Sequence, residues 1–169
     1  MPGPYDDPRA HDLRLAYHAA FGGDQLPVPV ELIAEDLLGL AVEVRDDLPV
    51  SGMLLPSERR ILVRSDEPEQ RRRFTIAHEL GHWVCQCLEG EMRPVYCRAA
   101  EIGVDAEAKA LEREANIFAA NLLMPEPSLL DVAHGEAPAL FGVSDEAMGW
   151  RLFNLGLSDQ RPARQADAT

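Results

Sequence analysis

The stretch from Arg73 to Trp83 contains a His-Glu-x-x-His motif made by His78, Glu79 and His82. On a helix, residues four apart share one face, and their side chains begin about 5–6 Å apart. Two imidazoles at this spacing can bind one ion at the roughly 2.0–2.1 Å that zinc requires. Glu79 follows the first histidine, so its carboxylate can reach a water molecule held by the metal and act as a general base. The motif therefore predicts a zinc site with hydrolytic chemistry, and that site needs a third ligand.

Two glutamates of a later segment are candidates for this third ligand, Glu112 and Glu114. Because they differ by about 200° of rotation on a helix, only one of them can face the ion. The apolar stripe of the segment contains Leu111, Ala115, Phe118 and Leu122. Glu114 lies about 70° from the centre of this stripe, and Glu112 lies about 90° away on its other side. These angles favour Glu114 slightly and leave Glu112 open, and two solvated acids without a role are the plain alternative.

The elements that must position these residues follow from hydrophobic periodicity and from turn signals. We expect an α+β fold in which a small three-stranded antiparallel sheet packs on a helical bundle that carries the His-Glu-x-x-His helix, followed by a C-terminal helical segment. The strands are predicted over residues 40–44, 52–55 and 60–64. The helices are predicted over residues 9–21, 30–38, 68–88, 105–124 and 128–134, with a helix-turn-helix-like pair over 139–155.

The domain organisation follows from length and composition. The chain has 169 residues, which suits one domain with a sizeable core. We expect a flexible N-terminus over residues 1–8, a single domain over 9–157 whose helical C-terminal part covers 126–157, and a disordered tail over 158–169. Residues 90–104 have no clear period, and we expect them to form a loop over the site.

The charge balance narrows the classes of partner. A net charge of −13, with Lys109 as the single lysine, argues against direct binding to duplex DNA, which needs clustered cations. Arg71, Arg72 and Arg73 are expected to form a solvated face instead of a nucleic-acid patch. No apolar run reaches the roughly 20 residues of a membrane span, and no charged-then-apolar leader opens the chain. The three cysteines have no disulfide-like spacing, so we place the protein in the reducing cytoplasm.

Three further residues are candidates for roles around the metal. Tyr96 and His134 are candidate stabilisers of the transition state, although a structural role for each is the simpler alternative. Cys97 lies in the predicted loop between the two ligand helices. A thiolate binds zinc well at about 2.3 Å and would displace the catalytic water, so Cys97 is a candidate inhibitory ligand that keeps the enzyme latent. Cys85 and Cys87 are expected to fill the core.

Two stretches together resemble one known family. Arg-Phe-Thr-Ile-Ala-His-Glu-Leu-Gly-His, followed by Glu-x-Glu-Ala-Asn-x-Phe-Ala-Ala-x-Leu-Leu-Met-Pro, is similar to the ImmA/IrrE metallopeptidases. The resemblance extends to Leu26–Val30, Ser51–Leu55 and Phe141–Ser144, and so covers most of the chain. It implies a zincin-like, zinc-dependent endopeptidase that cleaves a helix-turn-helix transcriptional repressor and thereby releases the silenced genes. In the family pattern the glutamate before Ala-Asn is the third ligand, which maps onto Glu114.

Two other classes of function stay open at this point. The chain could be a non-catalytic, zinc-containing module that binds and sequesters a repressor. A complete ligand set together with Glu79 argues against it, since a purely structural site has no need for a general base. The predicted helix pair over residues 139–155 could also bind DNA, but the net charge argues against that role as well.

Overall fold

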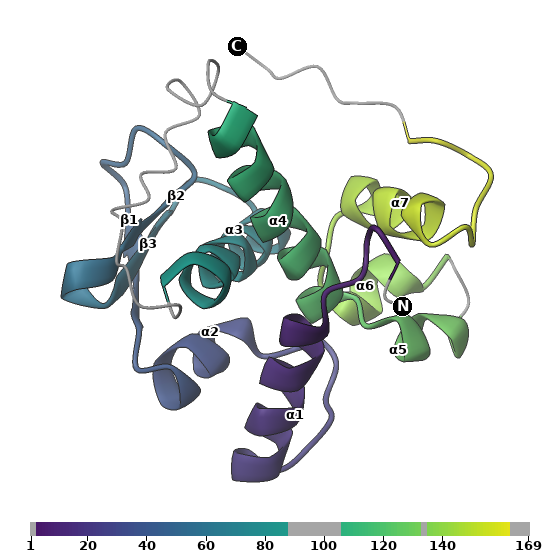
Figure 1. Ribbon diagram of the computed structural model, residues 1–169, viewed down its shortest axis with the longest axis horizontal. Coiled ribbons are helices and arrows are strands. Elements are labelled where there is room, and N and C mark those ends of the chain that lie inside the picture. The colour runs from purple at the N-terminus through teal and green to yellow at the C-terminus, as the bar shows by residue number, and fades with distance from the viewer. Residues whose placement is uncertain (1–2, 88–105, 133–134, 163–169) are drawn as a thin grey trace.

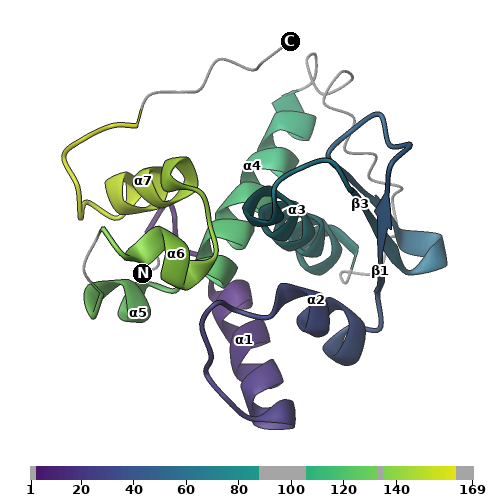
Figure 2. The ribbon, with the colours of Figure 1, turned by 180° about the vertical axis from the view of Figure 1, so that it is seen from behind.

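The computed structural model describes residues 3–87, 106–132 and 135–162. Outside these ranges lie the predicted loop over residues 90–104 with Tyr96 and Cys97, the candidate His134, and most of the predicted tail. The described residues form a mixed structure of helices and one small sheet, which confirms the α+β class. The sheet lies at one end of the molecule and the C-terminal helices at the other, with α3 and α4 between them (Figure 1, Figure 2).

The sheet contains β1 (Ala41–Arg45), β2 (Gly52–Leu55) and β3 (Arg60–Arg64) in the order β1-β3-β2. β2 and β3 are antiparallel and are joined by the 3-10 turn Pro56–Glu58. β1 is parallel to β3, so the expectation of a wholly antiparallel sheet is wrong. The short connection between β1 and β2 suggested that these two strands pair. Instead β3 lies between them and leaves β2 at an edge.

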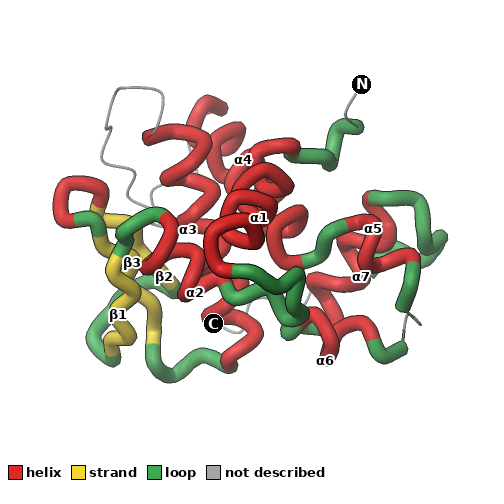
Figure 3. The backbone as a smooth tube through the Cα atoms, turned by 90° about the horizontal axis from the view of Figure 1, so that it is seen from below, coloured by secondary structure: helices red, strands yellow, loops and turns green. Residues whose placement is uncertain are grey.

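The N-terminal helices support the sheet and the central helices from one side (Figure 3). α1 (Pro8–Phe21) begins after Asp7, whose carboxylate accepts a hydrogen bond from the backbone N–H of Arg9. This is the usual way in which an N-cap satisfies a free amide at the start of a helix. α2 (Val30–Leu32) continues into a π-helical turn over Ile33–Leu37. Val30, Ile33 and Ala34 are fully buried, so this short segment contributes to the core that lies under the ligand helices.

The two central helices are α3 (Glu69–His82), which continues into a π-helical turn over Trp83–Cys87, and α4 (Ala106–Leu123). They cross at Gly81, where an added Cβ would lie 2.9 Å from the Cα of Ala115 and 3.0 Å from its carbonyl oxygen. Such a close backbone approach is available only to a residue without a side chain. Ile76, Ala77 and Leu80 of α3, with Phe118, Ala119 and Leu122 of α4, are buried against this crossing.

The C-terminal helices are α5 (Glu126–Leu130), α6 (Ala137–Phe141) and α7 (Asp145–Asn154). The hydroxyl of Ser144 caps α7 by accepting a hydrogen bond from the N–H of Ala147. Two arginines bind these helices to the rest of the fold through backbone carbonyls. Arg151 donates to the carbonyls of Met124 and Tyr5 at 3.1 Å each. No helix among the described residues is long and apolar enough to cross a membrane.

Arg73 is the second of these arginines and corrects one expectation. It was expected to share a solvated face with Arg71 and Arg72, but its side chain is buried. It donates hydrogen bonds to the carbonyl of Val28 at 2.8 Å and to that of Gly142 at 3.2 Å. Burial lowers the pKa of the guanidinium below its ordinary value. Arg73 therefore ties the first half of α3 to the turn between α6 and α7.

Candidate metal centre

Three side chains from α3 and α4 converge on one point. The Nε2 atoms of His78 and His82 are 3.1 Å apart. The carboxylate of Glu112 spans both imidazoles, with 3.1 Å from Oε2 to His78 Nε2 and 3.1 Å from Oε1 to His82 Nε2. Ligands bound about 2.0–2.1 Å from one tetrahedral ion lie roughly 3.3 Å from each other. The spacing of the three side chains therefore fits a single zinc-sized cation.

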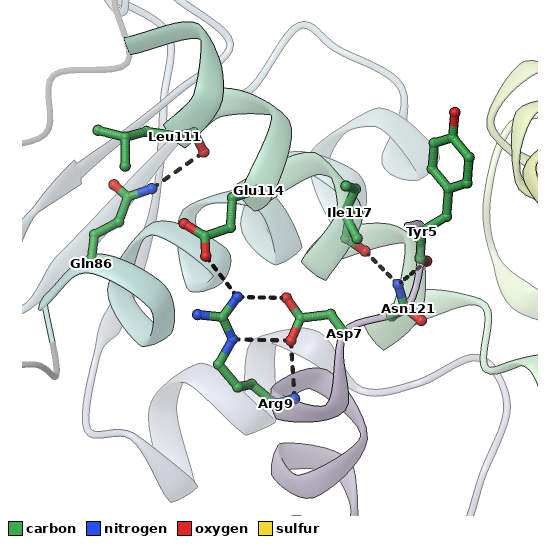
Figure 4. A network of polar contacts seen from close by, with 8 residues as sticks. All are labelled: Tyr5, Asp7, Arg9, Gln86, Leu111, Glu114, Ile117 and Asn121. Atoms are coloured by element: carbon green, nitrogen blue, oxygen red, sulfur yellow. Dashed lines mark hydrogen bonds and ion pairs between the residues drawn. The ribbon is translucent and has the colours of Figure 1, made fainter. Parts of the chain in front are cut away.

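The outer nitrogen of each imidazole faces an amide oxygen. His78 Nδ1 lies 2.9 Å from Asn116 Oδ1, and His82 Nδ1 lies 2.8 Å from Gln86 Oε1. The Gln86 amide is oriented by its own Nε2, which donates to the carbonyl of Leu111 at 3.3 Å (Figure 4). An amide oxygen can only accept, so each Nδ1 carries a proton, and a neutral imidazole in this orientation offers the lone pair of its Nε2 to a metal. This is the tautomer that metal-binding histidines adopt, and two such imidazoles beside a carboxylate can bind one cation between them.

The electrostatics of the cluster point in the same direction. Burial lowers the pKa of His82, but the hydrogen bond with Glu112 and the charges of Glu79 and Glu112 more than offset it, so the pKa lies above its ordinary value. Burial raises the pKa of Glu112, but its hydrogen bonds with His78 and His82 outweigh burial and bring that pKa far below the ordinary value. Both shifts follow from the close approach of the two imidazoles to the Glu112 carboxylate, which is the arrangement that a cation site requires.

The structure brings Glu112, and not Glu114, to the two histidines, so Glu112 is the candidate third ligand. Glu114 does not reach the histidines. Its Oε1 instead accepts a hydrogen bond from Arg9 Nη2 at 2.8 Å, and the same guanidinium binds Asp7 (Figure 4). Asp7 and Arg9 belong to the start of α1, so Glu114 holds the N-terminal helix against α4. The mapping of the family pattern onto Glu114 is therefore not supported by this geometry, and Glu112 takes its place.

The crossing of the two helices explains why the angular argument favoured the wrong residue. The centre of the apolar stripe is not the side of α4 that faces the metal, because that side is set by the contact between Gly81 and Ala115. Glu112 is three residues before Ala115 and lies about 60° from it, and Glu114 lies about 100° away on the other side. Asn116 falls on the same side as Glu112. One signal in the sequence could have found this pair, since Glu112 and Asn116 are four residues apart and share a face.

Glu79 follows His78 on α3, and its carboxylate lies close to β2 at the edge of the sheet. Its side chain is only 1% exposed. A Cβ added at Gly52 of β2 would lie 3.4 Å from Glu79 Oε1 and 2.2 Å from the methyl group of Thr75. The absence of a side chain at residue 52 thus lets β2 come close to the carboxylate. Glu79 is on the helix that carries both histidines but is not among the three converging ligand groups.

The remaining candidates from the sequence are Tyr96, Cys97, His134, Cys85 and Cys87. Tyr96, Cys97 and His134 lie outside the described ranges, so their predicted roles remain predictions. Cys85 and Cys87 are buried in the turn that follows α3, as expected of residues that fill the core. Burial raises the pKa of the Cys87 thiol.

The chain is similar in sequence and in fold to known proteins. Residues 34–153 match the model of the IrrE N-terminal-like domain family, Peptidase_M78. Over 131 residues the chain is 30% identical to the radiation response metalloprotease IrrE of Deinococcus radiodurans, and the match covers 77% of this chain and 38% of that protein. A Mycobacterium tuberculosis transcriptional regulator has a similar fold, with a TM-score of 0.64 at 23% identity over 98% of this chain and 55% of that one.

The chain thus spans well under half of the Deinococcus protein and about half of the mycobacterial one. The matched region of the family model contains β1 to β3, both ligand helices and nearly all of α7. The converging histidines and Glu112 all lie inside it. On the extent of this match, the chain belongs to the IrrE N-terminal-like domain family of peptidases.

Proposed function

We propose that this protein is a zinc-dependent endopeptidase that cleaves a helix-turn-helix transcriptional repressor and so releases the genes that the repressor silences. The observation that carries the proposal is the convergence of His78, His82 and Glu112 beside Glu79. Zinc is the ion proposed because two imidazoles and one carboxylate leave it a net positive charge and an open position. We place the reaction in the cytoplasm, where repressors act.

Each residue has a separate task in this reaction. His78, His82 and Glu112 hold the ion, and Asn116 and Gln86 keep the imidazoles in the ligating tautomer. When bound, zinc supplies Lewis acidity, which polarises the scissile carbonyl and lowers the pKa of water. The Glu79 carboxylate accepts the proton of the attacking water and then delivers it to the departing amine.

The substrate class is inferred from the family and from the charge of the chain. The Deinococcus relative is described as a radiation response metalloprotease. The net charge of −13 suits association with a basic DNA-binding domain better than with DNA itself. We therefore expect the substrate to be a repressor protein, with no direct binding of duplex DNA and no membrane partner.

One incubation tests this proposal. The zinc-loaded protein and its Glu79→Gln variant are each mixed with a candidate repressor, with and without a chelator, and fragments are identified by mass spectrometry. We expect cleavage only by the unaltered protein with zinc, while Glu79→Gln retains zinc and loses cleavage. Repressor that is bound but never cut by the zinc-loaded protein would favour the sequestering module instead. Cleavage retained in Glu79→Gln would contradict the role of this carboxylate.

Cys97 adds a regulatory proposal to the same site. We propose that its thiolate binds the zinc in a latent form, which follows from its place between the two ligand helices in the sequence. The cobalt-substituted protein would then have a thiolate-to-metal absorption band that Cys97→Ser lacks, and Cys97→Ser would have a higher basal activity. Cys87→Ser is the matched control because Cys87 is buried. An unchanged spectrum and unchanged activity in Cys97→Ser would refute the latent form.

A further inference from the structure

A groove of about 500 Å³ opens directly beside the metal centre. Glu112, one of the three candidate ligands, and Asn116, the hydrogen-bond partner of His78, also line this groove. From there it continues along α4 past Ala120 to Met124, at a spacing of four residues per step. Twelve residues of helix correspond to about 18 Å, the length of roughly five residues of extended peptide. The groove is therefore long enough to hold the chain of a substrate on one side of a bond presented to the metal.

The surface of the groove walls is mostly apolar, and the apolar residues come mainly from three separate helices. Phe74 of α3 lies one turn before His78, and Ile117 and Ala120 of α4 line the same groove. α7 closes the other side with Ala147 and Trp150. Trp150 is only partly buried, and the Arg161 guanidinium lies 5.5 Å from the centroid of its ring. Partly exposed aromatic residues in such clefts are the groups that most often dominate the energy of peptide binding.

The exposed rim of the groove carries positive charge, whereas the protein as a whole carries a net charge of −13. Lys109 and Arg113 are exposed on α4 one helical turn apart, and both line the groove. No carboxylate in the described ranges forms an ion pair with either of them. Arg113 instead lies over the ring of Tyr5, 5.9 Å from its centroid. Glu112 is the one carboxylate among the lining residues, and it belongs to the ligand cluster.

We infer that this groove binds the part of the substrate next to the cleaved bond, and that it selects an extended apolar segment carrying at least one carboxylate. The inference rests on the proposed peptidase function and adds a substrate preference to it. The apolar walls supply the affinity, and Lys109 and Arg113 select for negative charge. A basic DNA-binding surface does not fit this rim, so the groove binds a different part of the substrate from the one that the acidic surface attracts.

Direct binding of defined peptides tests the groove without requiring turnover. The protein is the zinc-loaded Glu79→Gln variant, and the ligand is a short fluorescein-labelled peptide of Leu and Phe with two Glu. Two matched peptides replace the apolar residues by Ser or the Glu residues by Lys. Fluorescence anisotropy measures each affinity. We expect the apolar acidic peptide to bind most tightly, and its affinity to fall with added salt because the contacts at the rim are exposed.

Variants of the groove are compared with variants elsewhere on the surface. Trp150→Ala should weaken binding by about tenfold, as loss of an aromatic anchor does, and Ala147→Phe should also weaken it by narrowing the groove. Leu140→Ala, on α6 and 40% exposed, is the control for an apolar truncation. The double variant Lys109→Gln with Arg113→Gln should bind the peptide several-fold more weakly. The double variant Arg60→Gln with Arg71→Gln should bind it as tightly as the starting protein. Zinc content and thermal unfolding verify that each variant is folded.

Two outcomes separate the groove from the peptidase function. Equal binding of the Ser-substituted peptide, or equal losses in Trp150→Ala and Leu140→Ala, would overturn the inference even if the protein cleaves a repressor. A second measurement exposes a peptide mixture from a digested bacterial proteome to the unaltered enzyme. Selective binding without any cleavage would retain the groove and contradict the proposed function. Cleavage beside apolar and acidic residues, lost in Trp150→Ala, would support both.

Discussion

Gly81 and Ala115 are in backbone contact, and this contact sets the rotation of α3 against α4. A Cβ at residue 81 would lie 2.9 Å from Ala115 Cα, a distance that real structures essentially never contain. Both histidines and Glu112 lie on the same side of this crossing. The approach of two backbones thus determines which glutamate joins the metal site.

Gly81→Ala should therefore damage both stability and metal binding. In an ordinary helix interior alanine is more favourable than glycine by up to about 1 kcal/mol. Here the added methyl group must separate two packed helices, and overpacking of this kind costs about 1–3 kcal/mol. We expect a lower unfolding temperature and weaker zinc binding, measured by calorimetry. Gly135→Ala is the control because nothing lies within 4 Å of a Cβ at that position. A stabilised Gly81→Ala protein would contradict the crossing.

The two glutamates of α4 should respond differently to the loss of charge. Glu112→Gln should reduce zinc affinity by more than the roughly 10–100-fold that loss of an outer-shell partner costs. Glu114→Gln should keep full zinc content, because Glu114 pairs with Arg9. Its stability should fall by no more than about 1 kcal/mol, since both partners are more than a third exposed and such pairs are screened by solvent. Equilibrium dialysis with elemental analysis measures the zinc binding of both variants. Loss of zinc in Glu114→Gln and full zinc content in Glu112→Gln would restore Glu114 as the ligand.

The amide partners of the histidines should matter for the metal and not for the fold. Asn116→Ala removes the acceptor of His78 Nδ1, so the imidazole is free to adopt the wrong tautomer. We expect zinc affinity to fall about 10–100-fold with little change in the unfolding temperature. Asn116→Asp should recover much of the affinity because a carboxylate also accepts from Nδ1. Equal affinities of the Ala and Asp variants would show that residue 116 does not orient the ring.

The buried thiol of Cys87 should react slowly and in a pH-dependent way. Burial raises its pKa, and only the thiolate is nucleophilic. With Cys85 and Cys97 replaced by Ser, alkylation by iodoacetamide at neutral pH should be much slower in the folded protein than in denaturant. Because the folded pKa lies above the unfolded one, this thiol should also reduce stability as pH rises past the ordinary thiol value. Mass spectrometry measures the alkylation, and equal rates in both states would contradict the burial.

The sequence by itself determined the parts of this protein that depend on local spacing. His78 and His82 share a face because any helix places residues four apart together. Gly22, which ends α1, and Ser144, which caps α7, are residues whose local chemistry favours those positions. The three strands follow from their alternating β-rich segments, and each was predicted to within one residue. The paired motifs of α3 and α4 were enough to indicate the family that the comparison confirmed.

Only the tertiary structure decided the features that depend on how separate elements meet. β3 pairs with both β1 and β2 and lies between them, and the lengths of the connections do not predict this order. Arg73 became buried because the turn at Gly142 supplies a carbonyl from a distant part of the chain. Glu112 replaced Glu114 because the rotation of α4 depends on Gly81 of α3, and the helical angle alone measures a residue only against its own helix. Local periodicity determines which residues share a face, and packing between elements decides what that face meets.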